Sequence, residues 1–429
     1  MAGTIGVAHG LPGRFYAKAL LYSKPRLAGA RLLYLFIFTF IFAFTACSGS
    51  TGSNASPSPR SPGPLNRTPS IHRGATNTGS ATPTAQIMLG AQPCPAAASR
   101  PSHWDSIVGT QNGVSMVETV SCATLIGAPV LQALVTVRYQ GTGSNLDVYV
   151  FNNIVDANPV RLFKLQGLYK GNARISAYST ILTAEVDQGS SINSNQPATG
   201  VVQDLFREFK WSGAAGTFVQ VTFPGIFPDL TRFQAEADQE QVNQGHQPWK
   251  LDADMTATAL AVNMLKWSSS AQATTVSGGG LRDLDAVVTV NSTSPGGGAI
   301  TVTLSRLEGN ANGGIWEATA VQAGNVATIT APVDHDLLTS PVTVAGTGPA
   351  PGGSIGRVVI LDHLYSTIGS ANVAGTTVAG NGKVTFSVSV PYQSTFHSGA
   401  EEGVVALYID NHVDGSIATA VMEKELLGA

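Results

Sequence analysis

Most of the chain after residue 130 consists of short segments in which apolar and polar residues alternate. Successive side chains of a β-strand point to opposite faces, so this pattern predicts strands with one buried and one solvated face. Turns rich in Gly, Asn and Ser separate the segments, as in GTGSN at 141–145. The segments expected to form strands are 133–140, 146–151, 173–187, 206–211, 217–223, 285–290, 300–304, 314–321, 357–361, 384–390 and 405–409.

Two segments in the middle of the chain predict helices instead. Thr231 and Gln234 have the spacing of an N-terminal capping box, and Gly245 is placed to end that helix. A second helix is expected from about 254 to 267, with an aspartate at its start and Lys266 at its end, where the helix dipole favours them. This helix and the meander that follows it predict a small α+β unit, in which Trp316 packs sheet against helix. In element order the unit resembles part of a cystatin-like or nuclear-transport-factor-like fold.

The pattern of the N-terminal residues differs from the strand pattern and from the helix pattern. An unbroken apolar or small run at 32–46 follows five basic residues, no acidic residue precedes it, and it ends at Cys47. The run is shorter than the roughly 20 residues of a typical membrane span and predicts a secretory signal. Its end, Phe44-Thr-Ala-Cys47, resembles a bacterial lipobox, with Phe44 where Leu is usual. The resemblance implies that Cys47 is lipidated and becomes the mature N-terminus, with an uncleaved membrane anchor as the alternative.

Composition indicates what lies beyond the signal. Residues 48 to about 92 are mainly Ser, Thr, Pro, Gly, Asn and Ala, which cannot bury enough apolar surface to fold, so we expect a flexible tether. From residue 101 onward the chain has 15 basic and 27 acidic residues, a balance that argues against a nucleic-acid partner. If Cys47 is lipidated, Cys94 and Cys122 remain as an even pair in an oxidising compartment, and we predict that they form a disulfide.

The last hundred residues carry the most specific likeness to a known family. The quoted segments are Ile329-Thr-Ala-Pro332, Ser340-Pro-Val-Thr-Val344, Val384-Thr-Phe-Ser-Val388-Ser-Val-Pro-Tyr392, Ala406-Leu-Tyr-Ile-Asp410 and Asp414-Gly-Ser416. In order and spacing they resemble the immunoglobulin-like domain of bacterial spore-germination proteins, called Gmad2. The resemblance implies an Ig-like sandwich and a link to sporulation or germination. The strand pattern independently predicts a β-sandwich.

Together these features predict a mainly β protein with a smaller α+β part. The expected organisation is a lipoprotein signal at 1–46, the lipidated cysteine and linker at 47–92, and a β-rich domain ending in a helix at 93–250. A small α+β unit at 251–326 and an Ig-like sandwich at 327–429 follow.

An aromatic-rich region supplies the candidate binding residues. A platform for a sugar or a protein partner is one interpretation, but such side chains more often fill a core, and we favour the core. The candidates are Phe206, Phe209, Trp211, Phe218, Phe223 and Phe227, and Phe233 lies in the same region.

Motifs for catalysis or metal binding are missing from the sequence. It contains no G-x-S-x-G, H-E-x-x-H or P-loop lysine. His335, His363, His397 and His412 lack metal-ligand spacing, and we interpret them as surface residues. We interpret the acids of the first predicted helix, Glu236, Asp238 and Glu240, as a solvated face. We interpret Asp410, Asn411 and Asp414 as turn residues. For each of these two groups, a metal site is the alternative.

The sequence therefore predicts a non-enzymatic, cell-surface lipoprotein that acts as a binding module or as a spacer in the bacterial envelope. Its expected partners are the membrane, through the lipid, and an envelope protein or glycan, with no cofactor. One alternative is a solute- or glycan-binding lipoprotein. Another is an envelope hydrolase in which Glu185, Asp187 and Glu208 meet in a cleft, which requires two carboxylates about 5–10 Å apart.

Overall fold

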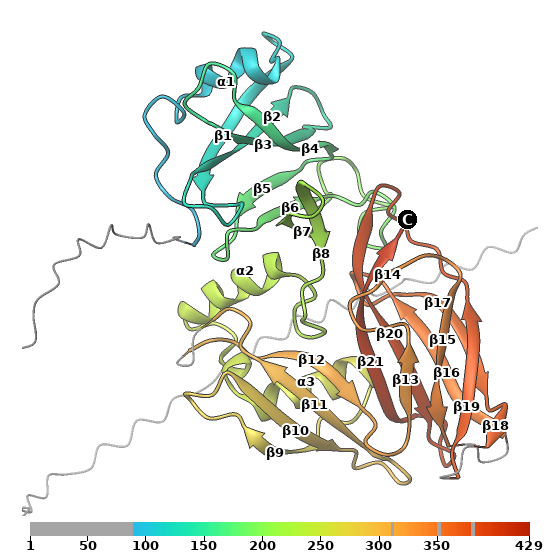
Figure 1. Ribbon diagram of the computed structural model, residues 1–429. Helices are drawn as coiled ribbons and strands as arrows, with labels where there is room; N and C mark the ends of the chain where they lie inside the picture. The colour runs from blue at the N-terminus through green and yellow to red at the C-terminus, as the bar shows by residue number, and fades with distance from the viewer. Residues whose placement is uncertain (1–88, 310–312, 350–352, 379–381) are drawn as a thin grey trace, which may run out of the picture. The chain divides into compact units, whose positions relative to one another are not determined.

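Antiparallel strand pairing accounts for most of the structure, a computed structural model that describes residues 89–309, 313–349, 353–378 and 382–429 (Figure 1). The protein is mainly β with a smaller α+β part, as predicted. The predicted signal, Cys47 and nearly all of the tether lie outside the described residues.

The first described part consists of two four-stranded sheets and one helix. The helix is α1 (Pro101–Val108). One sheet has the order β1-β2-β3-β4 and the other β5-β6-β7-β8. Their strands are β1 (Ser115–Ala123), β2 (Gln132–Tyr139), β3 (Leu146–Asn152), β4 (Val160–Leu168), β5 (Asn172–Ile175), β6 (Ile181–Glu185), β7 (Leu205–Ser212) and β8 (Thr217–Val221).

The expectation of one solvated face is wrong for β2 and β3, whose first six residues are all buried. Trp104 of α1 packs on one face of the sheet, and the second sheet contributes to the core on the other. Helix α1 was not predicted; Pro101 begins it, and Gly109, in the left-handed conformation with φ 76°, caps its C-terminus. A sheet covered on both faces buries every residue of its central strands.

Both helices expected in the middle of the chain are present. In α2 (Arg232–Asn243) the Thr231 hydroxyl accepts a hydrogen bond from the backbone N–H of Gln234, which is the predicted cap. A 3-10 turn, η1 (Pro248–Leu251), leads to α3 (Ala253–Met264), where the carboxylate of Asp252 caps the backbone N–H of Met255.

One long sheet occupies the rest of the chain. Its order is β17-β16-β20-β21-β12-β11-β10-β9, with β14 paired to β21 in parallel. The strands are β9 (Gln272–Gly278), β10 (Asp285–Asn291), β11 (Ala299–Ser305), β12 (Glu317–Gln322), β14 (Leu337–Leu338), β16 (Ser354–Leu361), β17 (Thr367–Ala374), β20 (Ala400–Asp410) and β21 (Ile417–Gly428).

A smaller four-stranded sheet faces part of the long one and completes a β-sandwich (Figure 1). Its order is β13-β15-β19-β18, from β13 (Thr328–Ala331), β15 (Val342–Gly348), β19 (Val384–Val390) and β18 (Thr377–Val378). Alternate residues of β20 serve two cores, because Val405 and Leu407 point into the sandwich whereas Val404 and Ala406 pack on the side of α3.

The predicted boundary at 326/327 falls inside this continuous sheet. The meander and the sandwich are joined where β12 pairs with β21, and the core under α3 includes Val359, Leu361 and Met422 from beyond the boundary. Strand β21, which connects the two segments, was not predicted. Residues 251–326 and 327–429 therefore share one sheet and one core.

Candidate functional site

A pocket of about 360 Å³ lies between β12, β13 and β21, and we call it the β12–β21 pocket. The register of β12 and β21 contains one residue pair, Val321 with Met422, so the two strands separate beyond it. Gln322 and Glu423 line the opening, and residues 327–329 border it from the side of β13. Its volume is within the range typical of small-molecule sites, about 300–1,000 Å³.

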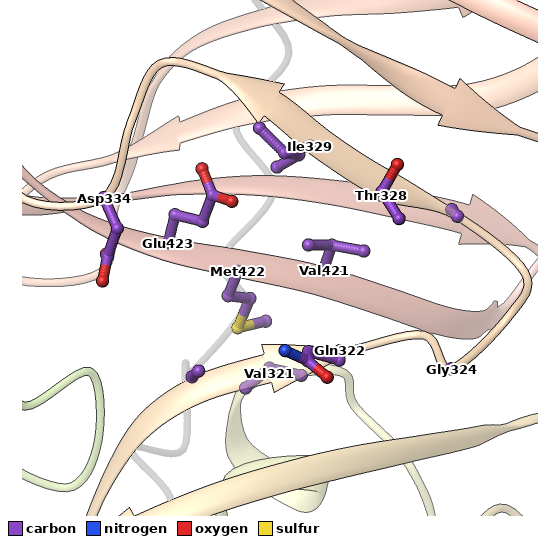
Figure 2. A pocket seen from close by; sticks show the side chains of 11 residues that line it. Val321, Gln322, Gly324, Thr328, Ile329, Asp334, Val421, Met422 and Glu423 are labelled. Atoms are coloured by element: carbon purple, nitrogen blue, oxygen red, sulfur yellow. The ribbon is translucent and has the colours of Figure 1, made fainter.

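The lining changes character from one side of the pocket to the other. Figure 2 shows Asp334 and Glu423 toward one end, with the thioether of Met422 reaching toward the middle. Buried Val421 and Ile329 supply apolar wall. An apolar pocket with a few charged groups at one end is typical of a site that orients a ligand by its polar terminus.

Four carboxyl groups, Asp334, Asp336, Glu423 and Glu425, form what we call the acidic cluster. Glu423 and Glu425 are two residues apart on β21 and so project from the same face, the one that carries Val421 into the sandwich core. Glu425 is fully buried, and neither of its carboxyl oxygens has a hydrogen-bond partner. Oε2 of Glu423 is also buried and unpartnered.

The turn at 333–336 brings the aspartates to β21. The backbone N–H of Lys424 donates to Oδ1 of Asp334 at 2.8 Å, and the backbone N–H of His335 donates to the carbonyl of Lys424 at 2.6 Å. The N–H of Leu426 donates to the carbonyl of Asp336 at 2.9 Å. These bonds place two aspartates beside the glutamates of the strand.

Burial and the neighbouring carboxylates raise the pKa values of the two glutamates. Burial is the larger cause for Glu423, Asp334 adds to it, and the pKa reaches about 7. For Glu425, burial again comes first, and Glu423, Asp334 and Asp336 add to the rise, which brings the pKa to about 9. The backbone N–H of Asp336 opposes this rise without making a hydrogen bond of normal geometry.

Within the described part of the chain, no lysine or arginine forms an ion pair with the acidic cluster. The nearest cationic candidate is His335, whose Nδ1 lies 3.6 Å from Oδ2 of Asp334, and both side chains are about two-fifths exposed. Lys424 belongs to a different group, because its Nζ lies 3.2 Å from Oε2 of Glu402 and donates to the carbonyls of Gly225 and Leu230.

His363 is buried, so its interpretation as a surface residue is wrong. Its Nδ1 forms an ion pair with Glu401, and its Nε2 lies 3.7 Å from Oδ2 of Asp204, a distance that fits an ion pair rather than a hydrogen bond. Burial alone would lower the pKa of His363, but Asp204 and Glu401 outweigh it and raise the pKa to about 10. The histidine therefore joins the segment between β6 and β7 to the sandwich as a buried cation. His335, His397 and His412 are exposed.

The aromatic candidates do not form an exposed platform. Phe209, Phe218, Phe223 and Phe227 are at most 8% exposed and belong to cores, which is the interpretation favoured from the sequence. The remaining three, Phe206, Trp211 and Phe233, are partly buried. Phe206 stacks on Phe233 with ring centroids 4.7 Å apart, and Trp211 lies edge-on to Phe218. Their surfaces are largely used for packing within the protein.

The acids considered for a hydrolase have separate partners. Glu185 pairs with Arg207, and Glu208 pairs with Arg232 at 3.0 Å. Asp187 accepts a hydrogen bond from Thr395, and the surface depression that it lines contains neither glutamate. This arrangement does not present two of these carboxylates to one cleft.

The side chains considered as alternative metal ligands also form bonds with other residues of the protein. On α2, Glu236 pairs with Arg174 and Asp238 with the buried Lys250, so only Glu240 fits the expected solvated face. The side chain of Asn411 accepts from the backbone N–H of Val413 and donates to the carbonyl of Pro295. Among the residues that the structure describes, no three His, Cys, Asp or Glu side chains are grouped so that they could hold a metal ion.

Cys94 and Cys122 form a disulfide, which ties the segment before α1 to β1. No helix in the described ranges has the length and hydropathy needed to cross a membrane.

Comparison with known proteins gave no match to any family model, curated protein or solved structure. The β12–β21 pocket was not among the predicted sites. The signal in the sequence is Val421-Met-Glu-Lys-Glu425, where two glutamates occupy alternate positions of a strand and are flanked on the same face by the apolar Val421 and Leu427.

Proposed function

We propose that this protein is a non-enzymatic lipoprotein of the bacterial envelope. In this proposal Cys47 carries the lipid and the tether separates the folded part from the membrane. The folded part acts as a binding module or as a spacer. The observation that carries the proposal is the disulfide between Cys94 and Cys122 in a chain with a lipobox-like sequence, since disulfides persist outside the reducing cytoplasm. A role in sporulation or germination rests on the resemblance of residues 327–429 to Gmad2 alone.

Buried and partly buried polar contacts between distant parts of the chain support a scaffold role. Arg207 on β7 donates to the carbonyl of Ser398, and the side chain of Gln220 on β8 donates to the carbonyl of Ala400 at 2.9 Å. The carboxylate of Glu402 accepts from the backbone N–H of Phe223. Such contacts stabilise one arrangement of the parts, as a spacer or a presenter of binding surface requires.

A second candidate, a solute-binding lipoprotein, is favoured by the β12–β21 pocket. In this form of the proposal the ligand contacts the pocket lining rather than the aromatic residues first considered. The envelope hydrolase is the least supported of the three functions, because Glu185 and Glu208 are each neutralised by an arginine.

The test of the anchor is expression of the full chain in a bacterium that processes lipoproteins. We expect the wild-type protein to incorporate labelled fatty acid and to partition into the detergent phase of Triton X-114, and the Cys47→Ala variant to do neither. Cys94→Ala in the same chain is the matched control and should still be labelled. Equal labelling of wild type and Cys47→Ala would contradict the lipoprotein assignment.

Mapping of a partner requires point variants rather than truncation. Removal of residues 327–429 would take β21 away from β12 and expose the core under α3, because both belong to the continuous sheet. Changes in partner capture by such a truncated chain would reflect unfolding as much as lost contacts.

A further inference from the structure

The β12–β21 pocket combines an apolar lining with two carboxylates that no lysine or arginine of the described residues pairs with. Glu423 contributes a buried oxygen without a hydrogen bond, and Asp334 stands beside it, two-fifths exposed. An isolated buried carboxylate is strongly disfavoured unless a cation or hydrogen-bond donors compensate it. Within the described residues this oxygen of Glu423 has neither, so its carboxyl group is stabilised by taking up a proton or by a ligand that brings positive charge.

We propose that the β12–β21 pocket binds the ammonium group of a small organic amine, with Glu423 and Asp334 as its charge partners. This inference rests on the second proposed function, a solute-binding lipoprotein, and specifies the class of ligand. The apolar body of the amine would lie against Val421, Ile329 and the thioether of Met422, which line the rest of the pocket.

The geometry favours an organic cation over a divalent metal ion. Calcium takes six to eight oxygen ligands, and magnesium requires near-octahedral oxygen coordination. The part of the chain that the structure describes groups no three acidic or histidine side chains for such coordination. An ammonium group needs fewer partners because it has three N–H donors, which one or two carboxylates and a carbonyl or amide oxygen satisfy. Gln322, which lines the pocket, supplies an amide oxygen.

Protonation of Glu423 makes binding depend on pH, because burial and the neighbouring Asp334 raise its pKa to about 7. The fully buried Glu425 lies two residues further along the same face of β21, and neither of its carboxyl oxygens has a hydrogen-bond partner of normal geometry. The charged group that acts on Glu423 is Asp334 on the adjoining turn, and Glu423, Asp334 and Asp336 act on Glu425. Opposite Glu423 on β20 lies the apolar Val405. The pocket-lining residues at 327–329 carry no ionisable side chain.

A cation beside Glu423 favours its ionised form, so binding should release a proton near neutral pH. The pKa of Glu423 is about 7 in the absence of ligand, and alkylammonium groups stay protonated well above this pH. Affinity should therefore rise as the pH increases from 6 to 8. Titration calorimetry in phosphate and in Tris should give different apparent enthalpies, because the released proton is taken up by the buffer.

The experiment uses the full-length protein in detergent micelles with 1,5-diaminopentane as the probe and 1,5-pentanediol as its neutral counterpart. We expect the diamine to bind and the diol to bind at least tenfold more weakly. Glu423→Gln should weaken diamine binding about tenfold to hundredfold, the value of one charge-assisted hydrogen bond in a partly buried site. Asp334→Asn retains the acceptor for the Lys424 N–H and should weaken binding in the same direction.

Asp414→Asn is the matched control, since it removes an exposed carboxylate from the turn between β20 and β21 and should change the affinity less than twofold. Thermal unfolding of each variant checks that the fold is retained. The proposal is overturned if wild type fails to bind the diamine at 10 mM and pH 8, if Glu423→Gln binds it equally well, or if the diol binds as tightly. Because the assay does not require the lipid, a failure here is distinct from a failure of Cys47 labelling.

Discussion

The substitution His363→Gln tests whether a buried cation holds the segment before β7 to the sandwich. Glutamine keeps a hydrogen-bond donor of similar size but removes the positive charge. Asp204 and Glu401, whose side chains are at most 1% exposed, would then be buried without the histidine as counter-ion. Removal of one partner from a buried ion pair typically costs about 3–5 kcal/mol, and we expect a loss of this size in the free energy of unfolding at pH 6.

The pH dependence of that loss has a definite sign. The pKa of His363 is raised from 6.5 to about 10 in the folded protein, so the folded state binds the proton more tightly than the unfolded state. The stabilisation is complete below pH 6.5 and is lost as the pH rises through 10. Linkage sets an upper limit of about 5 kcal/mol on this contribution, which agrees with the cost expected from breaking the ion pair.

The assay is urea unfolding of wild type and His363→Gln at pH 6, 8 and 10, with the exposed His397→Gln as the matched control. The difference in unfolding free energy between wild type and His363→Gln should be largest at pH 6 and smallest at pH 10. His397→Gln should stay within about 0.5 kcal/mol of wild type throughout. A difference that is the same at all three pH values would refute the assignment of His363 as a buried cation.

Two further substitutions test other buried contacts. Lys424→Met should reduce the free energy of unfolding by about 3–5 kcal/mol because it leaves the buried Glu402 unpaired, and Glu402→Gln in the same chain should restore part of the loss, as chemical denaturation will show. Replacement of both Cys94 and Cys122 by Ser opens a loop with a sequence separation of 28 and should cost about 3–4 kcal/mol, which thermal or urea unfolding under non-reducing conditions will measure.

Local signals in the sequence predicted many individual elements well. The capping residues Thr231 and Asp252 mark the starts of α2 and α3, because an N-cap side chain satisfies backbone donors that no neighbouring turn can satisfy. Alternation located β19 at Val384–Val390 without error, since one of its faces is buried in the sandwich and the other is polar. These features depend on residues close together in the chain.

Long-range pairing and buried charge were the features that sequence reasoning missed. The segment 417–428 contains Lys424 between two glutamates, a composition that suggests an exposed strand, yet β21 is the strand that joins the meander to the sandwich. Its charges are buried because partners from distant positions meet them, as Glu402 and the carbonyl of Leu230 meet Lys424. His363 was misjudged for the same reason, since its partner Asp204 lies far away in the sequence.

The position of the β12–β21 pocket follows from how the edge of β12 is shared. Near its start, Ala318 exchanges two backbone hydrogen bonds of 2.7 Å with the segment 226–227, and at its end Val321 pairs with Met422 of β21. One edge of β12 thus pairs with two different segments, and β21 does not pair with β12 along its whole length. Val321, Met422 and the residues next to them in both strands line the cavity, and the turn that carries Asp334 adds the charge. Because the pocket lies beside a backbone pair that stays intact, a ligand can occupy it without breaking the sheet.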